Sequence, residues 1–336
     1  MTQPASSPPP ATLPRRPRDA HKGTAGTAAI FGGSMHDGRC MIGAPALAAR
    51  AALRSGVGLA RIVAPRAVLP HAIALCPSAT GIALEADASG GLIAHQAAEV
   101  FDRALAESDC IAIGPALGTS DGAKALSLRA VQQEDVPAVI DADALTNLAA
   151  IPELSRDFHG ACVLTPHPGE FRRLAQALSI TADPVNPASR TAAAEQLAQR
   201  LGCITVLKGA GTVVTNGHDT WTCPAGHPCL ATAGTGDVLT GLLAGLIAQH
   251  LPRAGQPGGP GSAPDLHALA RARLSGQPAP PPATPRPTLY DLTRLAVWAH
   301  ARAGELWAST HHAEAGLLAQ DLADLLPEVL SSALAD

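Results

Sequence analysis

Thr232-Ala-Gly-Thr-Gly-Asp237 is followed by residues 238–250, a stretch that is apolar on nearly every side. Such a stretch predicts a helix that is buried all round. Gly234 and Gly236 would present backbone N–H groups at its N-terminus, where free donors and the helix dipole attract anions. Asp237 would stand in the first turn, either as a helix cap or as the group that takes a proton during phosphoryl transfer. We therefore expect an anion site at this helix, with Gly234, Gly236 and Asp237 as catalytic candidates.

Short apolar runs alternate with helical stretches on the N-terminal side of this helix. Their lengths and β-branched residues are typical of strands that are buried on both faces. The alternation predicts an α/β fold with a mostly parallel central sheet flanked by helices. Asn216-Gly217 then lies between two further strand-like runs, which predicts a hairpin and a small antiparallel edge. The parallel runs are residues 28–31, 59–64, 110–113, 138–140, 162–164 and 204–207.

Small or polar residues follow many of these runs at the point where each predicted strand ends. In open α/β sheets, ligands bind beyond the carboxyl ends of the strands. The segments should therefore meet along one edge and form one cleft. They are Gly32-Gly33-Ser34, Gly114-Pro115, Asp141-Ala142-Asp143, Thr165-Pro166-His167 and Lys208-Gly209.

Taken alone, several of these segments allow two interpretations. Lys208-Gly-Ala-Gly-Thr212 suits a phosphate, but it also suits a tight turn into the hairpin. Glu170, after Thr165-Pro-His-Pro, either begins a helix as an N-terminal acid or takes part in the site. Asp141 and Asp143 either hold Mg²⁺ indirectly or cap the next helix. Cys223-x3-His227-x-Cys229 lacks a fourth partner for a zinc site, so zinc is disfavoured.

The composition excludes several classes of protein. The chain has 336 residues, of which 46% are hydrophobic and 15% charged, so it can bury a large core and is not a disordered protein. The net charge of −4 shows no footprint of a nucleic-acid partner. The seven cysteines lie mostly in apolar surroundings, as is typical of a reduced compartment. We find neither an apolar leader segment nor a membrane-spanning run, and we expect a cytoplasmic protein without a membrane partner.

Two segments are too rich in proline and glycine to be assigned to the packed fold. Residues 1–20 read as a disordered tail, and residues 252–287 read as a surface insertion. The insertion could instead be a linker between two domains, but the 50 or so residues that follow it are few for an independent core. We therefore predict a single domain over residues 21–336.

Together these motifs resemble one family, the ADP-dependent NAD(P)H-hydrate dehydratases, which are related to ribokinase and the vitamin kinases. The likeness covers roughly residues 21–251 and 288–330. The element Gly234-Thr-Gly-Asp237 is shared by many such kinases, whereas the segments at 141–145 and 165–170 are more specific to the dehydratases. The matching stretches are Lys22-Gly-x-x-Gly26, Gly32-Gly-Ser34, Gly43-Ala44, residues 51–59, Gly114-Pro-Ala-Leu-Gly118, Asp141-Ala-Asp-Ala-Leu145, Thr165-Pro-His-Pro-Gly-Glu170, Lys208-Gly209, Gly234-Thr-Gly-Asp237, Ala303-Gly-Glu305 and residues 316–321.

The resemblance implies a ribokinase-like fold, a function and a set of site residues. The activity would be ADP-dependent dehydration of the S-epimer of hydrated NADH or NADPH, with Mg²⁺ as cofactor, giving NAD(P)H, AMP and phosphate. Substrate contacts would come from Ala44, Gly118, His167 and Asp237. The adenine nucleotide would be held by Lys208, Gly209, Ala210, Gly211, Thr212 and Gly236. Glu170 would be the acid near the metal.

The resemblance also implies partners and shows departures. It suggests a homo-oligomer, and it suggests a separate NAD(P)H-hydrate epimerase as pathway partner, because nothing in this sequence resembles the epimerase domain fused in some members. Ala116 stands where a glycine is usual, residues 35–42 lack the usual aromatic residue, and the insertion at 252–287 is unusual. The first two departures affect fine substrate contacts rather than the reaction.

Two other functions fit parts of the pattern. A kinase of the same fold would phosphorylate a hydroxymethyl group on a small vitamin precursor, and His167 with its turn argues against it. A nucleotide-binding regulator without turnover would keep the anion site but would not need Asp237. The preference for ADP over ATP is not fixed by the sequence.

Overall fold

The computed structural model describes residues 7–36, 38–251 and 286–335. Most of the predicted insertion at 252–287 therefore lies outside the described residues, as do residues 1–6 of the predicted tail. Within the described part, no helix is long and apolar enough to cross a membrane.

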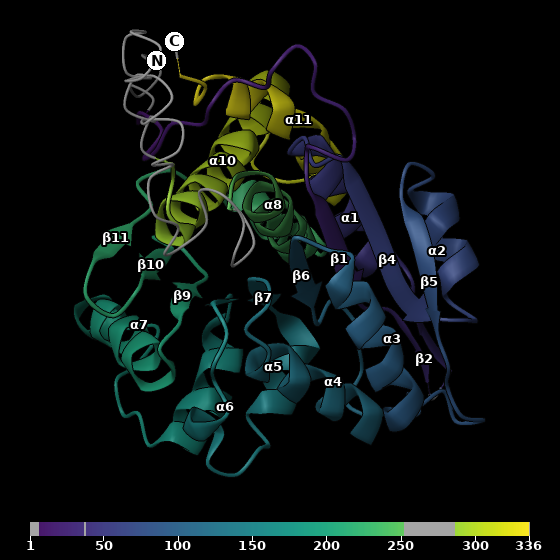
Figure 1. The fold of residues 1–336 in the computed structure, drawn as a ribbon. Coiled ribbons are helices and arrows are strands. Elements are labelled where there is room, and N and C mark those ends of the chain that lie inside the picture. Colours follow the sequence, from purple (N-terminus) through teal and green to yellow (C-terminus); the bar gives the residue numbers. More distant parts are fainter. Residues whose placement is uncertain (1–6, 37, 252–285, 336) are drawn as a thin grey trace, which may run out of the picture.

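A nine-stranded sheet forms the centre of the molecule, in the order β11-β10-β9-β8-β7-β6-β1-β4-β5 (Figure 1). The seven strands from β9 to β5 are parallel, and β10 and β11 add an antiparallel edge. This confirms the predicted fold class. The strands are β1 Thr27–Phe31, β4 Leu59–Pro65, β5 Thr80–Leu84, β6 Cys110–Ile113, β7 Ala138–Ile140, β8 Cys162–Leu164, β9 Ile204–Leu207, β10 Val213–Thr215 and β11 Thr220–Thr222; β2 Ser34–His36 and β3 Arg39–Met41 form a separate hairpin.

Helices cover both faces of the sheet, so its central strands are buried on both sides. In β1, Ala28 and Ile30 face one apolar core, while Ala29 and Phe31 face the other. The first core is covered by α1 Gly43–Arg54, α2 Leu69–Leu75, α8 Thr235–His250, α10 Leu289–His311 and α11 Ala319–Ser331. The second is covered by α3 Ala94–Ala106, α4 Asp121–Gln132, α5 Ala142–Leu148, α6 Pro168–Leu178 and α7 Pro187–Leu201.

Helix α8 is packed tightly against α1. A Cβ at Gly241 would lie 1.9 Å from the carbonyl oxygen of Ala48, and one at Gly245 would lie 2.1 Å from Oγ of Ser55. Neither position can hold a side chain unless a neighbour moves. Residues 238–248 of the apolar run are therefore buried as predicted, while Gln249 and His250 are partly exposed, and the start of α8 is fixed relative to α1.

The order of strands reverses next to β1, because the chain first adds β4 and β5 on one side and then β6 on the other. Backbone hydrogen bonds join the two strand ends: Gly114 N donates to Phe31 O at 3.1 Å, and Gly33 N donates to Pro115 O at 2.9 Å. Ligands in open α/β sheets bind at such a reversal. The fold therefore predicts a ligand site at the loops after β1 and β6.

Residues 7–20 differ from the predicted disordered tail. Leu13 is only 4% exposed, and it pairs with the other end of the chain through Leu13 N to Ala333 O at 2.7 Å and Ala335 N to Leu13 O at 2.9 Å. Leu13 packs beside the helices of the first core, and hydrogen bonds from Arg15 to Ala335 O and from Trp298 to Ser7 O also hold the segment.

Candidate active site

The N-terminus of α8 presents free backbone donors. Gly234 is the N-cap with φ +89°, and Thr235 Oγ1 donates to Leu230 O at 3.0 Å and Thr232 O at 2.9 Å. Nε2 of the partly buried His300 in α10 lies 2.8 Å from Thr235 O and must donate to it. The N–H groups of Gly234, Gly236 and Asp237 bond to no other group among the described residues. The unpaired donors on which the predicted anion site depends are therefore present, with His300 as a support that the sequence did not reveal, and the binding of an anion stays a prediction.

Asp237 is the third residue of α8 and makes no helix-cap hydrogen bond. The cap interpretation is therefore wrong, because the glycine at position 234 takes the N-cap place. Burial raises the pKa of the Asp237 carboxyl to about 7, and the negative charge of Asp141 adds to the rise while Lys208 opposes it. A carboxyl with a pKa near neutrality, beside free amides, suits a general base for a hydroxyl group.

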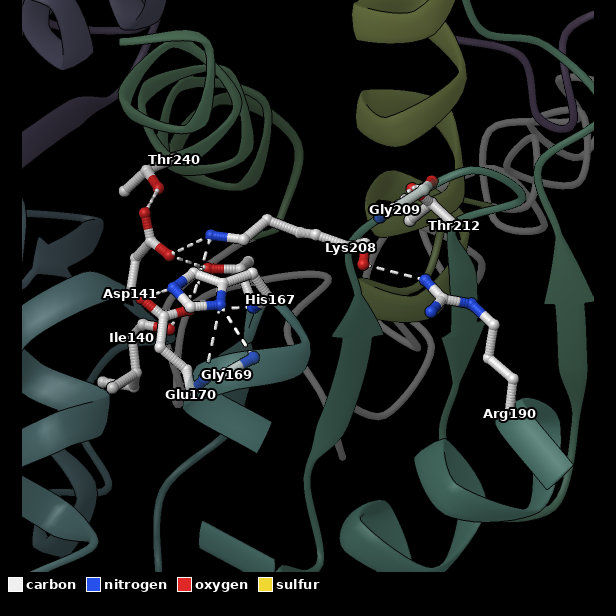
Figure 2. Close-up of polar contacts among 11 residues, drawn as sticks. Ile140, Asp141, His167, Gly169, Glu170, Arg190, Lys208, Gly209, Thr212 and Thr240 are labelled. Atoms are coloured by element: carbon white, nitrogen blue, oxygen red, sulfur yellow. Dashed lines mark hydrogen bonds and ion pairs between the residues drawn. The ribbon is translucent and has the colours of Figure 1, made fainter. Parts of the chain in front are cut away.

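Asp141 and Lys208 form the buried charged centre of the site (Figure 2). Lys208 Nζ donates to Asp141 Oδ1 at 2.7 Å, and Thr165 Oγ1 donates to the same oxygen at 2.7 Å. Thr240 of α8 donates to Oδ2 at 2.7 Å. Burial would raise the pKa of Asp141, but Lys208 and the two hydroxyls lower it more, so the carboxylate stays charged. Asp141 thus stands at the N-cap position of α5 without a side-chain cap hydrogen bond, and its predicted indirect role in holding Mg²⁺ stays a prediction.

The predicted Thr-Pro-His-Pro-Gly-Glu turn begins α6 with a reciprocal cap. Nδ1 of His167 accepts from Gly169 N at 2.9 Å and Glu170 N at 3.3 Å, while Glu170 Oε2 accepts from His167 N at 2.8 Å. Nε2 of His167 then carries the proton and lies 3.3 Å from Glu170 Oε1. Glu170 Oε2 is also 3.8 Å from Lys208 Nζ. The prediction that Glu170 begins a helix as an N-terminal acid is confirmed. The same turn places His167 and Glu170 beside Lys208.

The last residue of β9 and the turn that follows it, here together called the Lys208 loop (residues 207–212), close on themselves. Thr212 Oγ1 donates to Gly209 O at 2.9 Å and accepts from Gly209 N at 3.3 Å. Gly209 has φ +144° and Gly211 has φ +63°, both in the region that favours glycine. The loop is a tight turn, as one interpretation held, and it places Lys208 Nζ 3.8 Å from where a Cβ of Gly236 would lie. The Lys208 loop and the α8 terminus therefore share one site.

The segment after β6, here called the Gly118 turn (residues 114–118), approaches the site from the other side. Gly118 N donates to Asp143 Oδ2 at 2.8 Å, and Nδ2 of Asn147 donates to Gly118 O at 3.0 Å. A Cβ on Gly118 would lie 3.8 Å from Cβ of Ser34, an ordinary contact, so no neighbour fills the position of a methyl group there. Asp143 therefore positions this turn rather than capping α5, and Asn147 is a site residue that the sequence analysis missed.

Ala44 stands in the first turn of α1, one helical turn before Leu47. A Cβ on Gly234 would lie 2.8 Å from Leu47 Cδ1. The beginning of α1 is therefore next to the beginning of α8, where the resemblance places a substrate contact.

The charges of the site suit a divalent cation that arrives with a nucleotide. Burial and the charge of Asp141 raise the pKa of Glu170, so this acid, like Asp237, lacks a sufficient counter-ion. Among the described residues, no group of three His, Cys, Asp or Glu side chains could hold a metal. Mg²⁺ is usually held by one or two carboxylates together with phosphates and water. The donor set therefore fits Mg²⁺ shared with a phosphate group, and does not form a cage.

Comparison with solved structures defines the class of protein. A ribokinase-like superfamily protein of Enterococcus faecalis V583 matches with a TM-score of 0.67 and 23% identity, over 96% of this chain and 93% of that one. The chain thus has a ribokinase-like fold. It belongs to the NAD(P)H-hydrate dehydratase family, whose model matches residues 28–328.

The names of similar proteins agree with this family assignment. The ADP-dependent (S)-NAD(P)H-hydrate dehydratase of Bacillus subtilis (strain 168) is 33% identical over 95% of this chain and 94% of that protein. The ADP/ATP-dependent NAD(P)H-hydrate dehydratase from B. subtilis, co-crystallised with ATP/Mg²⁺, has a TM-score of 0.67 at 28% identity, over 96% and 95% of the two chains. A bifunctional NAD(P)H-hydrate repair enzyme of Coxiella burnetii is 39% identical over 72% of this chain but 45% of its own length. The chain spans about half the length of such bifunctional relatives.

Proposed function

We propose that this protein dehydrates the S-epimer of hydrated NADH and NADPH, with ADP as the phosphoryl donor. The observation that carries the proposal is the partly buried Asp237 beside the free amides of α8, facing Lys208. The family and the Bacillus relative supply the substrate class. A kinase of a small hydroxymethyl compound would use the same first step, so the assay must detect the dehydrated product.

The reaction begins with proton removal from the ring hydroxyl of the hydrate. Asp237 takes this proton as the oxygen attacks the terminal phosphorus of ADP, and AMP leaves. The amides of Gly234, Gly236 and Asp237 stabilise the charge on the transferred group. Lys208, held by Asp141, adds a fixed positive charge. The ring nitrogen then expels phosphate, and loss of a proton from the neighbouring ring carbon gives NADH, AMP and phosphate.

The ligands are assigned to the site as follows. Ala44, Gly118 and His167 would contact the hydrated dinucleotide together with Asp237. Residues 208–212 and Gly236 would hold the nucleotide. Glu170 would hold Mg²⁺ together with the nucleotide phosphates, and this ion supplies charge neutralisation when bound.

The surroundings of the reaction are also part of the proposal. Seven free cysteines, six of them buried, are consistent with a reducing cytoplasm. The names of the bifunctional relatives support an NAD(P)H-hydrate epimerase as pathway partner. We expect a homo-oligomer, as in the family that the sequence resembles.

The test follows the absorbance band of the dihydronicotinamide. Purified protein is incubated with hydrated NADH and Mg²⁺, with ADP, ATP or no nucleotide. A rise in absorbance that requires a nucleotide supports the proposal, and the faster nucleotide names the donor. A phosphorylated small molecule without any rise would replace it with the kinase.

A further inference from the structure

The nucleotide side of the site rests on a buried arginine outside every motif of the sequence. Arg190 lies in the first half of α7 and is only 9% exposed. Its Nη2 donates to Leu207 O at 2.9 Å and to Lys208 O at 2.8 Å. Its Nη1 donates to Pro184 O at 2.5 Å, and Nε donates to Gly211 O at 3.4 Å. One guanidinium therefore bonds to three carbonyls of the Lys208 loop.

Lys208 is consequently fixed at both ends. Figure 2 shows its side chain reaching toward Asp141, while Arg190 approaches the backbone of the same residue from the opposite direction. The guanidinium also packs under Gly209, where an added Cβ would lie 2.8 Å from Nη2. The position of the Lys208 ammonium is thus coupled to α7 through Arg190.

Arg190 has no carboxylate partner among the described residues, since each of its hydrogen bonds ends on a backbone oxygen. Burial lowers the pKa of the guanidinium, and no neighbouring acid offsets the effect. Buried charges are normally paired, because carbonyl dipoles replace lost hydration only in part. A cation left in this state directly beneath the loop that we assign to the nucleotide suggests that its counter-ion arrives with the ligand.

We propose that Arg190 is a positioning residue for the nucleotide: it holds the Lys208 loop in its binding shape, and its charge is balanced by the phosphates of the bound nucleoside diphosphate. This inference rests on the proposed function only in assigning the Lys208 loop to the nucleotide. A lysine could keep the charge but not the planar fork that serves several carbonyls at once. A methionine would keep much of the volume without the charge.

The experiment compares Arg190→Lys and Arg190→Met with the wild type in steady-state kinetics. We expect Arg190→Lys to raise the KM for ADP about tenfold and Arg190→Met to raise it further, as befits lost charge-assisted hydrogen bonds. The KM for hydrated NADH should stay within about twofold, because Arg190 does not touch the Gly118 turn. Arg129→Lys is the matched control, since Arg129 pairs with Asp102 at the surface of α4.

Thermal denaturation with ADP or adenosine provides a second readout. ADP should raise the Tm of the wild type, and most of that rise should be lost in Arg190→Met, whereas any smaller rise with adenosine should change less. If Arg190→Met lowers only the Tm of the ligand-free protein and keeps the full ADP-induced rise, Arg190 is a purely structural residue and the inference is wrong. Equal increases of both KM values would contradict it as well.

The outcomes also separate this inference from the proposed function. A wild type that binds ADP but leaves the hydrate unchanged would overturn the proposed function, and the Tm measurements would still decide the role of Arg190. A wild type whose Tm responds to no adenine nucleotide would overturn both.

Discussion

The Lys208 loop and the Gly118 turn both follow parallel strands and both contain two glycines with positive φ, yet side chains of opposite character hold them. A cation, Arg190, binds carbonyls of the first. Two side chains of α5 hold the Gly118 turn. The carboxylate of Asp143 accepts a hydrogen bond from the N–H of Gly118, and the amide of Asn147 donates one to its C=O. The positive charge of Arg190 suits a loop that binds phosphates. The negative charge of Asp143 suits a turn that binds the hydrogen-bonding groups of a dinucleotide.

In each segment, one glycine is required by the packing beneath it and the other has room for a methyl group. A Cβ on Gly114 would meet Asp141 O at 1.7 Å, and one on Gly209 would meet Arg190 at 2.8 Å, so these two are required by the packing below. Gly118 and Gly211 would meet nothing closer than 3.8 Å and 3.5 Å. A Cβ would make only ordinary contacts at these two positions, and we expect each ligand to approach the backbone there.

The largest effect is expected at Asp237, which lies between the two segments. Asp237→Asn removes the base but keeps the shape, so kcat should fall about 10²- to 10⁴-fold while both KM values change little. Steady-state kinetics and nucleotide binding check this expectation. A variant that retains near-normal turnover would show that the proton is taken by another group.

Gly118→Ala and Gly211→Ala form a matched pair, because both residues have positive φ and enough room for a methyl group. Both variants should lose about 1 kcal/mol of stability from the strained backbone. Gly118→Ala should raise the KM for hydrated NADH, and Gly211→Ala the KM for ADP, each about tenfold because a methyl group would occupy ligand space. Effects on the opposite ligands would show that the two sides are assigned the wrong way round.

A smaller change is expected when the support of the Gly118 turn is weakened. Asp143→Asn keeps the size of the side chain but replaces a charged acceptor of the Gly118 N–H with a neutral one. The KM for hydrated NADH should rise about three- to tenfold, with the KM for ADP unchanged. Lys124→Gln, at an exposed pair on α4, is a control that should leave both constants unaltered.

The same variant should move the pH profile of kcat/KM. In the wild type, the pKa of Asp237 is about 7, so the active base form should accumulate as the pH rises through that value. The charge of Asp143 contributes to this raised pKa. Asp143→Asn should therefore shift the rising limb toward lower pH, and a limb that stays in place would indicate that another group titrates.

The smallest expected effect is on stability. Ala116 has φ +54°, within the Gly118 turn, where an alanine is strained. Ala116→Gly should relieve this strain, partly offset by the greater freedom of glycine in the unfolded chain, for a net gain of about 0.5 kcal/mol. Thermal or denaturant unfolding measures it. A loss of stability would mean that the alanine side chain packs more favourably than its backbone strain costs.

The sequence predicts those parts of the molecule whose signals are local. The unpaired donors at the start of α8 can be predicted because Gly234–Asp237 and the buried helix are adjacent in the sequence, and the central strands can be predicted because both of their faces are apolar. Strand β5, Thr80–Leu84, is not predicted, because this edge strand is largely exposed at its start and has no clear pattern.

The supports of the site are hidden from the sequence for a different reason. Asp141 meets Lys208 and Thr240 across 67 and 99 residues, and threonine is too common a residue to mark such a contact. Arg190 binds backbone carbonyls, which every residue has, so no pattern of side chains announces its partners. Asn147 looks like any polar residue of a short helix until the fold places Gly118 beside it.

The close packing of α8 on α1 has a consequence for the entropy of the site. At the contact stand glycines and alanines such as Gly241 and Ala48, which have no rotamers to lose on folding and none to exchange afterwards. Helix α8 can therefore shift only if a whole backbone moves. Its terminal amides are held in place before any ligand arrives, so binding a phosphate there requires little further ordering of the protein.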